Sequence, residues 1–201
     1  MTSGVRASAR GLLAALLLAA TGICPAADPV DAWGMEQLMQ NLAQVKSAKG
    51  KFVERKYLAM LNAPLDSSGT LIYTAPGRLE KYTLLPKPET LVLEQDRLAI
   101  EYKDRNQRRT LMLQDYPVVW AMVESIRSTM AGDLQTLNRF YRTSLEGTEE
   151  RWRLSLKPAA PKMQSLVKEI QISGSRNRVR SIEVTEAEGD RSIMTITEEA
   201  P

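Results

Sequence analysis

Three close pairs of glutamates, at positions 149–150, 186–188 and 198–199, come nearest to a catalytic pattern in this sequence. Paired carboxylates can act as a general acid and a general base when a substrate lies between them. Each of these pairs falls where a turn or the end of a strand is expected, in contact with solvent, and no other reactive group recurs at a fixed spacing from it. We therefore assign no catalytic residue.

The chain has no histidine and a single cysteine, Cys24. Without histidine it lacks the usual general base at neutral pH and the commonest metal ligand, and one cysteine cannot form a zinc cluster. There is no glycine-rich phosphate loop, and no basic stripe with interleaved aromatic residues. The composition therefore disfavours an enzyme and predicts no metal, no cofactor and no nucleic-acid partner.

The first 27 residues have the features of a secretory signal peptide. Two arginines precede an apolar run at 11–23, and small residues follow, so we expect cleavage near Ala26 or Ala27. The run is too short for a membrane span, which needs about 20 apolar residues. Residues 28–201 then form a single domain of 174 residues with a net charge of +1. An exported, periplasmic protein is predicted.

Cys24 raises the alternative that the cysteine itself carries a lipid. Bacterial lipoprotein signals place Gly or Ala before that cysteine, and Ile23 stands there in this chain. Cleavage after the signal peptide would instead remove the only cysteine, leaving a mature domain without a disulfide. The sequence leaves this choice open.

Helical periodicity occurs at the start and in the middle of the mature chain. The first helix is expected from a cap at Asp31 to a stop at Gly50. Its apolar stripe is formed by Met35, Leu38, Met39, Leu42 and Val45. The second helix follows Pro117 and ends at Gly132, and a short third helix is capped by Asp133.

Period-two alternation predicts roughly six strands between the first two helices and four or five after the third. Short connections make neighbouring strands antiparallel. The fold class is therefore mainly β (α+β), with one large sheet that curves, fully or partly, into a barrel of about ten to eleven strands. The segment 69–86 carries large apolar groups on both faces of its two strands, so both faces need cover.

A sheet of this width has a concave face that its own side chains do not fill. The N-terminal helix and the central helix pair can fill it, as a plug and a lid. For the apolar residues on this concave face and on these helices, permanent packing in the core is an equally good interpretation.

The order of elements resembles the LolA-type periplasmic carriers of outer-membrane lipoproteins. The resemblance is carried by "KGKFVER", by "SGTLIYTAPGRLEKYTLLPKPETLVLEQDRLAIEYKD", and by the C-terminal "RWRLSLKP…IQISG…RVRSIEVTEAEGDRSIMTI". It covers nearly the whole mature chain. It implies an unclosed barrel capped by helices, around an apolar cavity that takes the acyl chains of a lipoprotein or another lipid. It also implies a monomer that travels between an inner-membrane donor and an outer-membrane acceptor.

On this resemblance, ten residues form the cavity wall: Leu71, Tyr73, Leu79, Tyr82, Leu91, Leu93, Leu98, Ile100, Trp152 and Leu154. The lid residues are Trp120, Met122, Val123, Ile126, Met130, Leu134 and Leu137. Arg78, in the turn "PGR", is assigned a polar contact with the carbonyl or phosphate of the cargo.

The chain departs from the family pattern around that same turn. In the best-known carriers an arginine precedes the turn proline and helps to hold the closed lid, and here Ala75 stands in its place. Leu79 replaces a bulky aromatic residue, and Lys81 stands where a tryptophan is common. How the lid is held and what the cargo is therefore stay open. An envelope module that senses lipids or lipoproteins, and a cofactor-free enzyme on the same fold, are the alternatives.

Overall fold

The structure is a computed structural model that describes residues 33–199. The expected signal peptide, Cys24 and the Asp31 cap lie outside the described residues. No helix of the described part is long and apolar enough to cross a membrane.

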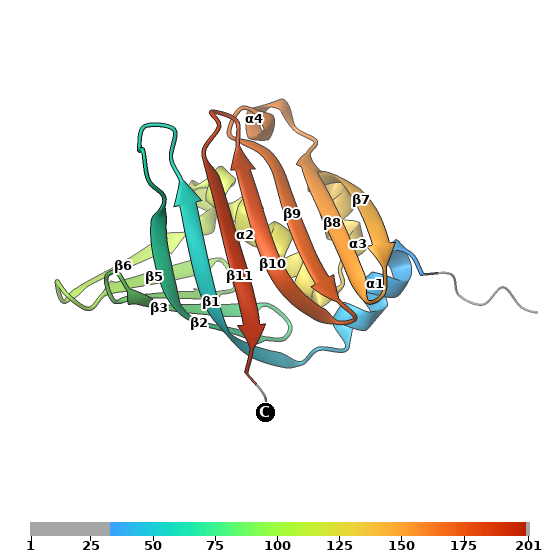
Figure 1. The fold of residues 1–201 in the computed structure, drawn as a ribbon, viewed down its shortest axis with the longest axis horizontal. Helices are drawn as coiled ribbons and strands as arrows, with labels where there is room; N and C mark the ends of the chain where they lie inside the picture. Colours follow the sequence, from blue (N-terminus) through green and yellow to red (C-terminus); the bar gives the residue numbers. More distant parts are fainter. Residues whose placement is uncertain (1–32, 200–201) are drawn as a thin grey trace, which may run out of the picture. The chain divides into compact units, whose positions relative to one another are not determined.

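Residues 33–199 form eleven strands and four α-helices (Figure 1). The helices are α1 (Met35–Ala43), α2 (Pro117–Ala131), α3 (Leu134–Phe140) and α4 (Pro161–Gln164), and a single 3₁₀ turn, η1 (Leu113–Asp115), precedes α2. Before α2 lie the strands β1 (Ser47–Tyr57), β2 (Leu65–Thr74), β3 (Arg78–Leu85), β4 (Glu89–Glu94), β5 (Arg97–Tyr102) and β6 (Gln107–Met112). After α3 lie β7 (Tyr141–Thr148), β8 (Arg151–Pro158), β9 (Val167–Ser175), β10 (Arg178–Glu186) and β11 (Arg191–Glu198). The periodicities predict their order except for the strand β7 and the short helix α4.

All eleven strands belong to one sheet, whose order is β6-β5-β4-β3-β2-β1-β11-β10-β9-β8-β7. Every neighbouring pair is antiparallel, and β1 joins the two halves by pairing with β11. The sheet is not closed, because β6 and β7 form its two edges. The predicted fold class, an open antiparallel sheet of about ten to eleven strands with an N-terminal helix and a central helix pair, is confirmed.

One face of the sheet, called here the inner face, packs against the helices. It carries Trp152, Leu154 and Leu156 on β8, which are at most 1% exposed and form a core with α1 and α3. In Figure 1 helices α2 and α3 lie behind β7–β11, on the side away from the viewer. Directly paired residues of antiparallel strands point to the same side, so the strand registers extend the inner face to the other strands.

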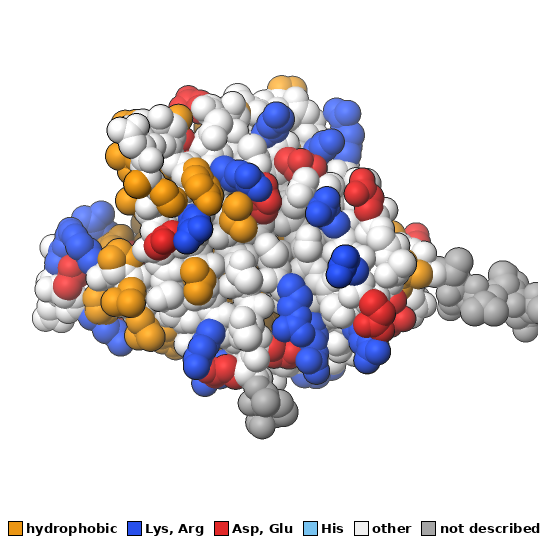
Figure 2. Space-filling model, viewed as in Figure 1, with side chains coloured by type: hydrophobic (Ala, Val, Ile, Leu, Met, Phe, Trp, Pro, Cys, Tyr) orange, Lys and Arg blue, Asp and Glu red, His pale blue; other side chains and the backbone are white. Residues whose placement is uncertain are grey.

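The outer face, seen in Figure 2, differs between the two halves of the sheet. Charged side chains of both signs are scattered over β8–β10, whereas hydrophobic side chains gather near the hairpin of β1 and β2. The exposed large apolar residues of this region are Val53, Tyr57, Met60, Leu61, Leu65, Leu84 and Leu85, at 41–86% exposure. The expectation that both faces of 69–86 are covered is therefore wrong at Leu84, which is 64% exposed.

The first helix is shorter than the sequence predicts. It ends at Ala43, and the chain is already a strand at Ser47, so Gly50 lies within β1 and does not end the helix. Gly50 pairs with Glu198, and a Cβ at this position would lie 3.0 Å from the Ile196 side chain. Close strand packing, and not a helix stop, accounts for this glycine.

Candidate functional site

Helix α2 buries its polar side and leaves its apolar side partly open. Glu124, Ser125, Ser128 and Thr129 share one side of the helix and are 0–9% exposed. On the opposite side, one turn apart, lie half-buried apolar residues: Val119, Val123, Ile126 and Met130. A helix that only packed onto a core would show the reverse distribution.

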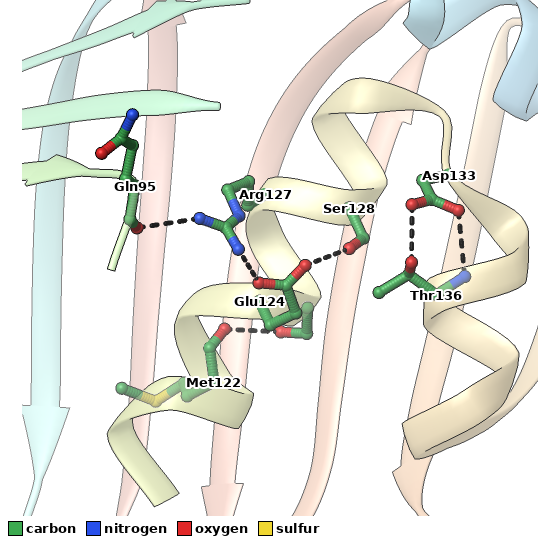
Figure 3. Close-up of polar contacts among 8 residues, drawn as sticks. Gln95, Met122, Glu124, Arg127, Ser128, Asp133 and Thr136 are labelled. Carbon is green, nitrogen blue, oxygen red and sulfur yellow. Dashed lines mark hydrogen bonds and ion pairs between the residues drawn. The ribbon is translucent and has the colours of Figure 1, made fainter. Parts of the chain in front are cut away.

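The buried polar side satisfies its own hydrogen bonds, as Figure 3 shows. Ser128 Oγ donates to Glu124 Oε1 at 3.0 Å, and Ser125 Oγ donates to the Met122 carbonyl at 2.7 Å. Thr129 Oγ1 donates to the Ser125 carbonyl at 2.7 Å. Because these groups are paired within the helix, they can leave water without a large penalty.

This side of α2 approaches α1 and β7 closely. Gly132 caps α2 with a left-handed backbone (φ +69°), and a Cβ there would lie 2.2 Å from the Met39 carbonyl oxygen of α1. Tyr141, at the start of β7, is 3% exposed and is hydrogen-bonded to Ser125. Burial raises the pKa of Tyr141 to about 12. These contacts orient the apolar side of α2 away from α1.

Two of the seven predicted lid residues belong to α3. Leu137 is 1% exposed and lies in the core, and Leu134 packs against that core. Asp133 caps the helix by accepting hydrogen bonds from the Thr136 amide at 2.9 Å and from Thr136 Oγ1 at 2.6 Å (Figure 3). The lid residue Trp120 of α2 meets α3 through Phe140, edge to face at 4.8 Å between ring centroids. The predicted lid residues thus form one packed helix pair.

Five of the predicted wall residues form a half-buried apolar surface on the inner face of β2–β5: Leu71, Leu79, Leu91, Leu98 and Ile100. The registers place them together, since Leu91 pairs with Ile100 and the neighbouring pairs share its face. Solvent reaches this surface, unlike the core below β8 and β9. The half-buried side of α2 is another apolar surface that solvent reaches.

Four further wall residues are buried in the present structure. Tyr73 and Leu93 are 4% and 3% exposed and flank the half-buried surface. Trp152 and Leu154 lie on β8 in the core with α1, and Trp152 Nε1 donates to the Arg176 carbonyl at 2.8 Å. These two residues support the helices and lie apart from β2–β5.

The structure places Tyr82 and Arg78 on the outer face of β3, away from the other wall residues. Tyr82 donates to Glu80, and Arg78 forms ion pairs with Glu80 at 2.8 Å and Glu94 at 2.7 Å. The carboxylate of Glu80 has its pKa lowered by the hydrogen bonds from Tyr82 and Arg78. Strand alternation separates them from Leu79, so neither residue faces the inner apolar surface.

Hollows on the outer face are lined mainly by charged and polar residues. One, of about 350 Å³, crosses β3–β6 and is walled by charged residues including Arg78, Glu94, Arg97 and Arg108. Within the described part of the chain, no group of three or more His, Cys, Asp or Glu residues is arranged to hold a metal ion.

A charged cluster on the inner face was missed by sequence reasoning. Glu54 is 6% exposed and lies 2.6 Å from Lys81 Nζ. Burial raises the pKa of Glu54, but the ion pair with Lys81 and the contacts of Lys56 and Ser192 outweigh burial, so the pKa is lowered overall. The signal was present in the alternation, because Phe52 and Glu54 are two residues apart and share a face of β1.

Comparison with known proteins assigns the chain to a family. The family model described as outer membrane lipoprotein carrier protein LolA-like matches residues 26–200. The chain belongs to this LolA-like family. No curated protein matches it significantly.

Solved structures that resemble the LolA-like chain are distant in sequence. A LolA superfamily protein from Nitrosomonas europaea has 9% identity and a TM-score of 0.41, over 85% of this chain and 96% of that one. A putative outer membrane lipoprotein-sorting protein domain from Vibrio parahaemolyticus has 7% identity and a TM-score of 0.44, over 83% and 91%. A chain of the MucA/MucB complex of Pseudomonas aeruginosa has 14% identity and a TM-score of 0.47, over 83% of this chain and 57% of that one.

In this LolA-like chain an arginine of α2 reaches the turns of the sheet, as Figure 3 shows in part. Arg127 Nη1 donates to the Gln95 carbonyl of the β4–β5 turn at 2.9 Å, while its other Nη donates to Glu124. Its aliphatic part lies against Gly77 in the β2–β3 turn, where a Cβ would be 2.6 Å from Arg127 Cδ. Arg127 thus links α2 to the turn in which Ala75 replaces the family arginine.

Proposed function

We propose that this protein is a periplasmic carrier that holds the acyl chains of a lipoprotein or another lipid and moves them toward the outer membrane. The chains lie between the inner face of β2–β5 and the apolar side of α2. An inner-membrane donor supplies the cargo, an outer-membrane acceptor receives it, and the carrier acts as a monomer without catalysis. Residues 1–27 direct export, and residues 28–201 are the single lipid-binding domain.

The observation that carries this proposal is the distribution of burial on α2. The helix turns its small and polar residues, among them Ser125 and Ser128, toward the protein, and it leaves Val123 and Ile126 half-buried. The five half-buried wall residues of β2–β5 are apolar in the same way. Two apolar surfaces that solvent reaches are unfavourable unless a guest covers them.

The energetics suit a reversible carrier. Each buried methylene contributes about 0.8 kcal/mol, so a chain of eight to ten methylenes contributes roughly 6–8 kcal/mol before the costs of association. A methionine side chain such as Met130, on the half-buried side of α2, adapts to chains of different shape. Release requires α2 to move, and Arg127 is the contact that must then open.

Native mass spectrometry of the protein purified from its own periplasm tests this proposal. A carrier retains a lipid or lipoprotein, and its spectrum shows the corresponding added mass. Capture of one protein partner without lipid would instead support the sensing module. Conversion of an added small molecule by lipid-free protein would support the enzyme. Either result would replace the carrier proposal.

Variants locate the binding surface. We expect Leu98→Asp on the inner face and Ile126→Asp on α2 each to weaken binding of a fluorescent acyl probe by about tenfold or more, because each places a charge against the chain. Val53→Asp is the matched control, since Val53 is 55% exposed on the outer face of β1. Equal binding by all three variants would exclude this location for the cargo.

A further inference from the structure

A buried carboxylate interrupts the apolar inner face at the centre of the sheet. Glu54 Oε1 accepts a hydrogen bond from Ser192 Oγ at 2.8 Å, and Oε2 accepts hydrogen bonds from Ser67 Oγ at 3.3 Å and from Lys81 Nζ at 2.6 Å. Lys56 Nζ lies 3.7 Å from the same carboxylate. Glu54 and Lys81, called here the inner-face ion pair, join β1 to β3 across β2.

Lys81 belongs to the apolar wall by its position. In the registers it pairs with Leu71 on β2 and with Leu91 on β4, so half-buried leucines flank it on both sides. From this row its side chain crosses β2 diagonally, and its ammonium lies 4.9 Å from the centroid of the Phe52 ring. Gly69, which pairs with Phe52, has no side chain on that diagonal.

The ammonium of Lys81 keeps hydrogen-bonding capacity toward this surface. Its side chain is 20% exposed, compared with 7% for Glu54. An ammonium group has three N–H donors, and among the described residues Glu54 is its one hydrogen-bond acceptor. The Phe52 ring faces the cation but accepts no conventional hydrogen bond. A further acceptor can therefore approach Lys81 from the half-buried side.

Stability alone is a weak reason for this arrangement. Replacing a buried ion pair by well-packed apolar residues is often neutral or stabilising, because desolvation of two charges offsets their attraction. Leucines or a tryptophan would line a purely apolar wall with less cost. An ion pair that keeps one partner accessible is better explained by recognition.

We propose that Lys81 determines cargo specificity by donating a hydrogen bond to an acceptor oxygen, such as a carbonyl, carboxylate or phosphate oxygen, at the polar end of the acyl chain. This inference rests on the proposed function and names the chemistry that the carrier selects. Glu54 holds the ammonium in place, so it acts as a positioning residue. Lys56, with 50% of its side chain exposed, is the third charge beside Glu54 and Lys81. The three groups together carry a net charge of +1, which disfavours a cationic cargo.

Competition between ligands of equal chain length tests the proposal. Lipid-free protein is loaded with a fluorescent acyl probe, which is displaced by dodecanoate, methyl dodecanoate or dodecyltrimethylammonium. We expect the wild type to prefer the two oxygen-bearing ligands over the cation by about tenfold or more, the effect of one hydrogen bond to a charged group. Lys81→Met abolishes this preference and Lys81→Arg retains it.

Two controls separate ligand recognition from folding. Lys51→Met removes a cation from the opposite face of β1, where 73% of the side chain is exposed, and keeps the wild-type preference. The double variant Glu54→Gln with Lys81→Met avoids an unpaired buried carboxylate, and it also loses the preference while still binding the probe. Thermal unfolding of each variant shows that it is folded.

The outcomes distinguish the two proposals. If the wild type fails to bind the probe and all three ligands, the carrier function itself fails. If it binds all three with equal affinity, or if folded Lys81→Met keeps the preference, the role of Lys81 is overturned while the carrier function stands.

Discussion

The indole of Trp152 on β8 lies directly over Gly174, its register partner on β9. A Cβ at Gly174 would be 2.3 Å from Trp152 Cζ2 and 2.1 Å from the Arg178 carbonyl oxygen. The indole can therefore occupy this position only because residue 174 has no side chain. The contact fixes the half of the sheet that carries α1 and α3.

Gly174→Ala should destabilise the fold by about 1–3 kcal/mol, because the added methyl overpacks a site bounded by backbone and by a buried ring. Urea unfolding followed by far-UV circular dichroism measures the change. Ser173→Ala, one residue earlier and on the outer face, serves as the control and should leave the midpoint within error. An unchanged midpoint for Gly174→Ala would contradict the contact.

Removal of the Asp133 cap tests how the start of α3 is stabilised. Asp133→Ala loses the hydrogen bond to the Thr136 amide and should cost about 1 kcal/mol. Asp133→Asn keeps an acceptor at the cap and should cost much less. The difference between the two unfolding free energies is the measurement, and equal values for both variants would mean that the cap does not contribute.

The link between α2 and the sheet can be tested through Arg127. Arg127→Met removes the hydrogen bond to the Gln95 carbonyl, so amides of α2 and of the β4–β5 turn should exchange faster with deuterium. Arg142→Met, an exposed substitution on β7, provides the comparison and should leave exchange in α2 unchanged. If the α2 amides are equally protected from exchange in Arg127→Met and in the wild type, contacts other than Arg127 hold α2 against the sheet.

Strand periodicity predicts most of the architecture. The alternation in segments such as "RLAIEYK" and "RWRLSLK" identified β5 and β8, and short connections predicted antiparallel pairing. Periodicity does not identify β7, because its sequence "YRTSLEGT" lies at a sheet edge and is mostly polar. The predicted end of α1 at Gly50 is wrong, because strand packing in β1, and not the end of a helix, requires this glycine.

The site was harder to predict than the fold. Tyr82 and Arg78 lie on the opposite face of β3 from Leu79. This follows from the sequence once 78–85 is recognised as one strand, because successive side chains alternate between faces. The burial of Ser125 and Thr129 does not follow, because it depends on how α2 meets α1 and Tyr141 in three dimensions. An apolar stripe indicates which side avoids water, but not whether a core or a ligand covers it.

The Glu54 carboxylate should make stability depend on acidic pH. Its folded-state pKa is lowered from about 4.5, so its contribution is present above the unfolded pKa and is lost as the pH falls through the folded value. Glu54→Gln should lower the free energy of unfolding at pH 7 by about 1–3 kcal/mol, because it removes the carboxylate that Lys81 stabilises. The variant should also lose less unfolding free energy than the wild type between pH 5 and 3. Glu146→Gln, an exposed change on β7, should follow the wild type.

Tyr141 gives the opposite dependence at alkaline pH. Its folded-state pKa of about 12 lies above the value of 10 for a free tyrosine, so the unfolded chain loses this proton first as the pH rises. Stability therefore declines between pH 10 and 12, by at most about 1.4 kcal/mol per pH unit from this residue. Urea unfolding at pH 9, 10 and 11 should show that the free energy of unfolding declines less steeply for Tyr141→Phe than for the wild type. Tyr116→Phe is the control, because the Tyr116 side chain is 46% exposed, and its decline should match that of the wild type. Parallel declines for Tyr141→Phe and the wild type would mean that the Tyr141 hydroxyl reaches water in the folded protein, and the packing of α2 against β7 would then be looser than its contact with Ser125 indicates.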